Sequence, residues 1–202
     1  MRITLKSIIS IWMSLTLAAI VAASLTGCSK DAALMQPEPV LKVLSRTPDA
    51  LMENFVKTYG ERDLDTYAQL LHEQFIYTFN PETSRNLGPS YEYFTRQDEL
   101  ECAANLFSGE VVTNSRGQQV PAITAIEFRH WEQIGDWELA SPDEVDGLRG
   151  VFECTIRFVR AGAGDLTVRG RQLFTVAMAD VSDGEGAVGP YYQIIGWQDL
   201  TR

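Results

Sequence analysis

The chain has 202 residues, with 17 Lys and Arg against 27 Asp and Glu, which gives a formal net charge of −10 at pH 7. This length suits one ordinary domain with a hydrophobic core and a tether, and a second domain would be crowded. The acidic balance argues against nucleic acid as a partner, because phosphate binding needs a clustered positive surface and the sequence contains none.

The first 27 residues resemble the signal peptide of a bacterial lipoprotein. Arg2 and Lys6 precede an apolar run from Ile8 to Ala23, and the segment closes with Leu25-Thr26-Gly27-Cys28. A charged start followed by an apolar run is typical of an export signal, and this run is slightly short for a membrane span. The resemblance implies cleavage before Cys28 and acylation of its thiol and new amine with fatty acids such as palmitate.

Lipid on Cys28 would make the membrane a partner of the chain, since each buried CH2 contributes about 0.8 kcal/mol and several chains hold a protein essentially permanently. Ser29 resembles the residue preferred there for sorting to the outer membrane of Gram-negative cells. We therefore expect a cell-envelope protein that is lipid-anchored at the outer membrane and faces the periplasm. The polar, proline-containing stretch that follows Cys28 is typical of a tether. The expected organisation is a signal peptide at 1–27, the lipidated cysteine and tether at 28–46, and the domain at 47–202.

Two amphipathic helices are expected at the start of the domain. Thr47 is suited to cap the first helix, with Pro48 at the position where a missing N–H has no cost, and an apolar stripe at helical spacing continues to Gly60. Asp63 is expected to cap a second, shorter helix. Its apolar side is supplied by Leu64, Tyr67, Leu70 and Leu71.

From Gln74 the apolar period changes to two, which predicts a strand whose one side carries Phe75, Tyr77 and Phe79. Pro81 to Pro89 is expected to be a loop. Thr95 can then cap a third helix, whose acidic first turn is favourable near the positive helix end. The side chains expected to face inward from it are Leu100, Ala103, Ala104 and Phe107.

Four long stretches rich in β-branched and aromatic residues follow, and each predicts a strand. They are Ala122 to Gln133, Leu148 to Ala161, Leu166 to Val181 and Tyr191 to Leu200. The second stretch alternates between a polar side and an apolar side composed of Phe152, Cys154, Ile156 and Phe158. The tight turn at 162–165 favours antiparallel neighbours. Helices gathered early and strands late indicate an α+β domain.

This order of elements resembles the NTF2-like fold shared by SnoaL-type proteins and ketosteroid isomerases. LMENFVKTYGERDLDTYAQLLHEQFIYTF at 51–79 resembles the family's opening helices and aromatic strand, and YYQIIGWQDL at 191–200 resembles its closing strand. The resemblance implies an α+β cone in which three N-terminal helices pack on a curved antiparallel sheet around a hollow. Family members use that hollow to bind small apolar molecules or, in fewer cases, to catalyse with an acid and a base. The isomerases' catalytic set has no residue-by-residue match here, so no catalytic role is transferred.

His130 is the first polar candidate for such a hollow, because it follows Ile126 and Phe128 on alternate strand positions and would share their inward face. An imidazole there could act as an acid, a base or a ligand anchor. The alternative is that His130 lies at a strand end, hydrogen-bonded or solvated. Glu127 is a second candidate proton carrier, on the opposite face of the strand from His130.

Aromatic side chains could line the hollow with flat apolar walls and phenolic donors, although such residues are more often simply core. The expected ligand-binding residues are Tyr77, Phe79, Tyr91, Phe94, Phe128 and His130, with Tyr93 also near the mouth.

Cys102 and Cys154 could form a disulfide in an exported protein, or could both be small buried side chains. No metal site is expected, because no close pair of zinc ligands exists. Asp180 to Glu185 resembles a calcium loop, but its glycine falls one position early and the last carboxylate of such a loop is absent. The acidic side chains of the connection at 143–146 need only water as a partner, so neither segment is expected to bind calcium. No cofactor is expected.

The polar side of the sheet is expected to carry cross-strand charge pairs worth about 0.2 to 1 kcal/mol each. The residues concerned are Glu127, Arg129, Glu153, Arg157, Arg169 and Arg171. The same face could instead form a homodimer, with Trp197 and Phe174 as anchors.

The leading functional hypothesis is a lipid-anchored envelope protein whose domain binds a small apolar ligand or a protein partner without chemistry. One alternative is a SnoaL-like isomerase or hydrolase that uses His130 or Glu127. The other is a homodimeric structural lipoprotein.

Overall fold

The structure is a computed structural model that describes residues 45–87, 93–114, 117–141, 146–182 and 187–201. The predicted signal peptide, Cys28 and most of the tether lie outside the described residues, as do Tyr91, Asp143 and Glu144. The elements, in chain order, are α2 (Pro48–Glu61), α3 (Leu64–Leu70), β1 (Leu71–Thr78), α4 (Pro81–Leu87), β2 (Tyr93–Thr95), α5 (Arg96–Phe107), β3 (Val112–Thr113), β4 (Gln119–Val120), β5 (Ile123–Leu139), β6 (Leu148–Arg160), β7 (Leu166–Ser182) and β8 (Ala187–Asp199).

The three predicted helix caps are confirmed. The Thr47 side chain accepts a hydrogen bond from Ala50 N at the start of α2, and Asp63 accepts one from Thr66 N at the start of α3. At α5, Thr95 and Asp98 form a reciprocal capping box. Each cap satisfies backbone donors that the first helical turn leaves without partners.

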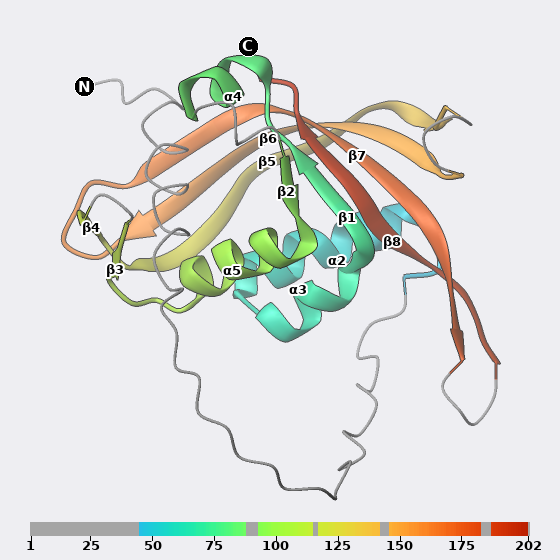
Figure 1. The fold of residues 1–202 in the computed structure, drawn as a ribbon, viewed down its shortest axis with the longest axis horizontal. Coiled ribbons are helices and arrows are strands. Elements are labelled where there is room, and N and C mark those ends of the chain that lie inside the picture. The colour runs from blue at the N-terminus through green and yellow to red at the C-terminus, as the bar shows by residue number, and fades with distance from the viewer. Residues whose placement is uncertain (1–44, 88–92, 115–116, 142–145, 183–186, 202) are drawn as a thin grey trace, which may run out of the picture.

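A six-stranded, strongly curved sheet forms the second layer, in the order β2-β1-β8-β7-β6-β5 (Figure 1). The four predicted long strands are all present, and the β6–β7 turn joins antiparallel neighbours as expected. The expectation of a wholly antiparallel sheet is wrong, because β1 pairs with β8 in the parallel direction. Two helices and six strands separate β1 from β8 in the sequence, so the chain has the length that a parallel pairing requires.

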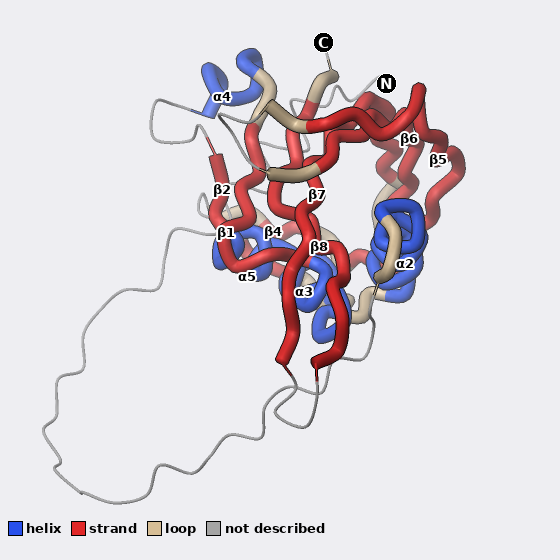
Figure 2. The backbone as a smooth tube through the Cα atoms, turned by 90° about the vertical axis from the view of Figure 1, so that its right-hand side faces the viewer, coloured by secondary structure: helices blue, strands red, loops and turns tan. Residues whose placement is uncertain are grey.

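Helices α2, α3 and α5 pack together against one face of the sheet, whereas α4 lies at the opposite end of the domain (Figures 1 and 2). The predicted loop at 81–89 is wrong over residues 81–87, which form α4. Asn80 caps this helix by accepting from Thr83 N at 2.8 Å, and Pro81 follows at the first position. Beyond the body of the domain, β7 and β8 continue as a projecting hairpin.

The core lies between the helices and the sheet. Phe55 of α2 is 1% exposed and contacts the rings of Phe174, Trp197 and Trp131, with centroid separations of 5.2, 5.4 and 5.7 Å. The predicted apolar side of β6 is buried in full. Aromatic rings this close add to area burial through edge-to-face and stacked contacts.

Candidate functional site

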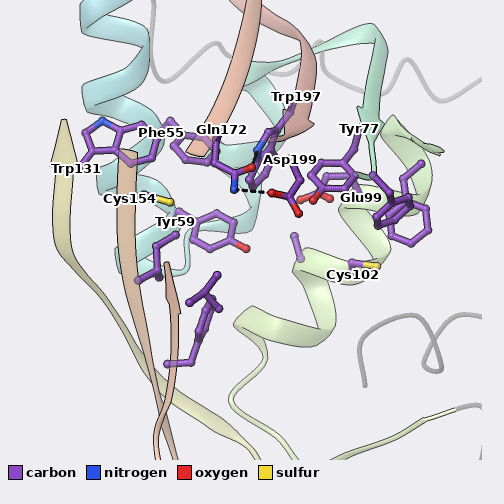
Figure 3. Close-up of a pocket in the computed structure, with 16 residues that line it drawn as sticks. Phe55, Tyr59, Tyr77, Glu99, Cys102, Trp131, Cys154, Gln172, Trp197 and Asp199 are labelled. Carbon is purple, nitrogen blue, oxygen red and sulfur yellow. Dashed lines mark hydrogen bonds between the residues drawn. The ribbon is translucent and has the colours of Figure 1, made fainter. Parts of the chain in front are cut away.

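A cavity of about 160 Å³ lies between the helices and the sheet (Figure 3). Its wall draws on α2, α5 and the strands β1, β5, β6, β7 and β8, with Phe94 added from β2. The lining residues are Phe55, Tyr59, Tyr77, Phe79, Phe94, Glu99, Cys102, Ala103, Trp131, Cys154, Ile156, Phe158, Val168, Gln172, Trp197 and Asp199. Most of this surface is apolar, with a few polar groups among aromatic rings, as in many small-molecule sites.

Aromatic contacts hold the part of the wall that β1 and β8 supply. The Tyr77 ring lies 5.1 Å from the Trp197 ring and 4.9 Å from the Phe79 ring, both edge to face. Phe79 in turn contacts Phe94 of β2 at 4.8 Å. Each ring is fixed by its neighbours, so the wall is largely preformed.

Glu99 of α5 is a buried carboxyl in the cavity wall. It is 8% exposed, and its Oε1 accepts a hydrogen bond of 2.8 Å from the Tyr67 hydroxyl of α3. Burial raises the pKa of Glu99 to about 7, because a charged carboxylate loses its hydration, while the Tyr67 hydrogen bond acts in the opposite direction. Near neutral pH this group therefore exchanges between its acid and its carboxylate form.

Asp199 of β8 is the second carboxyl, and it is held by several donors. Its Oδ2 accepts from the Asn80 side-chain amide at 2.7 Å, and its Oδ1 accepts from Gln172 Nε2 at 3.3 Å and from Thr201 N at 2.9 Å. The Gln172 Oε1 accepts from the Trp197 indole at 2.8 Å. This network ties α4, β7 and β8 together and fixes the polar end of the cavity.

The hydroxyls of Tyr59 and Tyr77 have no hydrogen-bond partner among the described residues. Figure 3 shows the Tyr59 hydroxyl directed into the cavity and the Tyr77 ring beside Glu99 and Asp199. Burial raises the pKa of both phenols well above the usual value, and the neighbouring acids raise it further. Both phenols are therefore neutral donors at physiological pH, available to a bound molecule.

Cys102 and Cys154 are free, buried thiols in the structure, which agrees with the alternative of two small buried side chains rather than a disulfide. Burial raises the pKa of Cys154 to about 11 and that of Cys102 further still. Because the thiolate is the reactive form, these side chains serve as cavity wall and not as nucleophiles.

The prediction that His130 faces inward is wrong. Phe128 pairs with Ile156 and Trp131 pairs with Cys154, so three steps along β5 match two steps along β6. This bulge reverses the alternation and brings Trp131 into the cavity wall in place of His130. The His130 side chain is 44% exposed, and its Nε2 lies 3.4 Å from Glu132 Oε2 on the surface.

Glu127 lies outside the cavity as well. Its Oε2 pairs with Arg129 and, at 3.1 Å, with Nη1 of Arg157 on the neighbouring strand. Glu153 and Arg171 form a further pair at 3.7 Å, so charge pairing on the outer face is confirmed at these positions. Exposed pairs of this kind contribute little to stability.

Some of the predicted ligand-binding residues line the cavity and others do not. Tyr77, Phe79 and Phe94 line the cavity, whereas Phe128 packs in the adjoining core against Phe55 and Tyr59. Tyr93 is 55% exposed on β2. Of the proposed dimer anchors, Phe174 is fully buried and Trp197 lines the cavity, so the prediction that they face outward is wrong.

The polar residues that sequence reasoning missed are Glu99, Gln172 and Asp199. A signal for Glu99 was present, since Glu99, Cys102, Ala103 and Leu106 follow helical spacing and all are buried on one face of α5. Asp199 ends the closing strand two residues after Trp197, on the same face of β8. Its long-range partner Asn80 gives no signal in the sequence.

Within the described ranges, no group of three or more His, Cys, Asp or Glu side chains is placed to hold a metal ion. No helix among those residues is long and apolar enough to cross a membrane.

Three helices on one face of a curved sheet, closed around an interior cavity, are the architecture expected from the resemblance. The fold is an NTF2-like α+β cone. No family model and no curated protein matches the sequence.

Solved structures with a similar backbone course exist, and three of them, each at low sequence identity, are the following. A protein provisionally assigned as an aromatic ring hydroxylase from Novosphingobium aromaticivorans is 12% identical, with a TM-score of 0.48 over 76% of this chain and 85% of that one. An NTF2-like protein of unknown function in nutrient uptake from Rhodospirillum rubrum is 13% identical, with a TM-score of 0.42 over 75% of this chain and 95% of that one. A ketosteroid isomerase-like protein from Erwinia carotovora atroseptica is 9% identical, with a TM-score of 0.44 over 76% and 94%. Likeness at this level carries no inference about chemistry.

Proposed function

We propose that this chain is a lipid-anchored cell-envelope protein whose NTF2-like domain binds a small, largely apolar ligand inside the cone. The observation that carries the proposal is the cavity itself, with aromatic walls and two phenolic hydroxyls that have no partner among the described residues. A ligand oxygen or nitrogen could accept hydrogen bonds from these hydroxyls.

A cavity-filling variant tests this proposal. Ala103 of α5 is 2% exposed and lines the cavity, so Ala103→Leu would place three further carbons where the ligand would lie. We expect small aromatic probes such as phenol to raise the melting temperature of the parent protein and to leave that of Ala103→Leu unchanged. Ala104→Leu, on the next position of α5 outside the lining, is the matched control. Equal probe effects on parent and Ala103→Leu would contradict binding in the cavity.

The anchor is tested separately. Acylation of Cys28 predicts that the protein incorporates labelled palmitate in cells and partitions with membranes, and that Cys28→Ser abolishes both. Ser29 supports placement at the outer membrane facing the periplasm, which membrane fractionation would check. Mass spectrometry that finds an unmodified thiol at position 28 would refute the anchor and leave the cavity argument untouched.

A second candidate function is proton-transfer catalysis, and the observation that favours it is Glu99. A carboxyl whose pKa lies near 7 can both accept and donate a proton at physiological pH. The reaction would take place on a ligand held beside Tyr59 and Tyr77. If this function is correct, the protein should exchange the α-hydrogens of a cyclic ketone with D2O, as followed by NMR. Glu99→Gln should stop that exchange, whereas His130→Gln and Glu127→Gln should not.

A further inference from the structure

The cavity wall is acidic and holds no compensating base. Glu99 and Asp199 line it, whereas Lys, Arg and His are absent from the lining. Within the described part of the chain, neither acid forms an ion pair. Their hydrogen-bond donors are a phenol, two side-chain amides and a backbone N–H, all of which are neutral.

Aromatic rings supply most of the remaining wall. Eight of the lining side chains are aromatic, and they include both indoles, Trp131 and Trp197. The face of an aromatic ring carries partial negative charge, so rings attract a cation by about 0.5 to 2 kcal/mol each when water is excluded. Rings and acids together make the interior favourable for positive charge and unfavourable for negative charge.

Resting on the proposed ligand-binding function, we propose that the cavity selects small organic cations, in which an amine or quaternary ammonium group is carried on an apolar body. The cationic group lies beside Glu99 and Asp199, close to the Tyr77 ring (Figure 3). The apolar body lies against Ile156, Phe158 and Val168, where β6 and β7 supply a hydrocarbon wall.

The acids distinguish such a ligand from a neutral one of the same shape. A neutral ligand gains the burial of its apolar surface alone, whereas a cation also restores an opposite charge to carboxyls that have lost their hydration. An amine also donates to carboxyl oxygens that accept few other bonds, and a quaternary ammonium aligns toward them, as at Glu99, where the Tyr67 hydroxyl is the donor. Comparing the affinities of a cation and of a neutral ligand of the same shape therefore measures the contribution of the two carboxyls.

Affinity for a cation should rise with pH through the titration of Glu99. The titratable groups that face Glu99 are Tyr59 from α2, Tyr67 from α3, Tyr77 from β1, Asp199 from β8 and Cys102 from its own helix. The phenols and the thiol have raised pKa values, so they stay neutral between pH 5 and 9. Since the pKa of Glu99 is about 7, proton competition should weaken cation binding about 30-fold between pH 8.5 and pH 5.5.

The experiment compares benzyltrimethylammonium with neopentylbenzene, which has the same shape but carbon in place of the charged nitrogen. Isothermal titration calorimetry of the full chain in detergent, against detergent alone, would measure both at pH 8.5 and pH 5.5. At pH 8.5 we expect benzyltrimethylammonium to bind at least tenfold more tightly than neopentylbenzene. On acidification to pH 5.5, the affinity for benzyltrimethylammonium should fall, whereas the affinity for neopentylbenzene should stay the same. Proton release on cation binding at pH 7, read from two buffers of different ionisation enthalpy, is a second readout.

The variants separate this inference from the proposed function. Glu99→Gln should lower cation affinity at least tenfold, remove its pH dependence and leave neopentylbenzene binding unchanged, and Glu101→Gln on the exposed side of α5 should behave as the parent. Equal binding of the two probes, or tighter binding of neopentylbenzene, would overturn the inference while the proposed function stands. Failure of both probes would count against both. If Glu99→Gln does not fold, the pH dependence of the parent protein decides alone.

Discussion

Replacing Glu99 by Gln should make the stability of the domain less dependent on pH. The pKa of this carboxyl is raised from 4.5 to about 7 by burial, against the opposing effect of the Tyr67 hydrogen bond. The folded protein therefore holds a proton at pH values where the unfolded chain has lost it. Folding takes up that proton, so the free energy of unfolding falls as pH rises from 4.5 and levels off above about 7.

The magnitude follows from the size of the pKa shift. One pKa unit corresponds to about 1.4 kcal/mol, so the rise from 4.5 to about 7 costs about 3 kcal/mol of stability above neutral pH. Gln cannot ionise, and its side-chain oxygen can still accept from Tyr67 at the position of Glu99 Oε1. Glu99→Gln should therefore be close to the parent at pH 4.5 and more stable than it by about 2 to 3 kcal/mol at pH 8.5.

Urea unfolding followed by tryptophan fluorescence, at pH 4.5, 6 and 8.5, would measure this difference. Glu101→Gln is the matched control, because Glu101 is exposed on the same helix and should show no such trend. A stability difference between Glu99→Gln and the parent that stays constant across the three pH values would refute the assignment of a raised pKa to this residue.

Three further predictions concern the fold and the thiols. Thr95→Ala removes the capping box of α5 and should cost about 1 kcal/mol in urea unfolding, with Thr124→Ala on the exposed side of β5 as the comparison. Phe174→Ala empties a fully buried site and should cost about 3 to 5 kcal/mol, provided that unfolding remains two-state. In the Cys28→Ser protein, Cys102 and Cys154 should resist DTNB while folded and react on unfolding, and rapid labelling at pH 8 would contradict their burial.

Local sequence signals predicted most of the elements, because the physical causes are local. Thr47, Asp63 and Thr95 are caps whose side chains bond to backbone groups three residues away. The period of two in β6 predicted its buried face, since alternation needs no knowledge of the partner strand. The α4 helix was missed although Asn80-Pro81 is a good start, because the same dipeptide is also a strong turn signal.

Features that depend on pairing between distant strands could not be predicted in this way. The bulge in β5 is defined by its register with β6, and it exchanges the faces of His130 and Trp131 without any local mark. The parallel pairing of β1 with β8 likewise depends on how the whole chain closes. For the same reason the hydrogen bond between Asn80 and Asp199, which fixes the polar end of the cavity, emerges only in three dimensions.

Burial of a charged residue was the remaining source of error at the site. Asp98 and Glu99 both lie in the first turn of α5, where a favourable interaction with the positive helix end would explain an acidic residue at either position. Only Asp98 has that role, as the partner of Thr95, while Glu99 points into the domain. Glu99 lies on the same buried helical face as Ala103, whereas Asp98 does not. The direction in which each helical position faces is therefore as informative as the cap.

The most direct test of the account is a crystal structure of the protein soaked with 4-iodophenol, whose iodine is located by its anomalous signal. The account predicts an anomalous peak inside the cone, among Tyr59, Cys102 and Trp197, with the phenol oxygen within hydrogen-bond reach of Tyr59, Tyr77 or Glu99. Iodine found only on the outer surface, with the interior filled by the protein's own side chains, would contradict it.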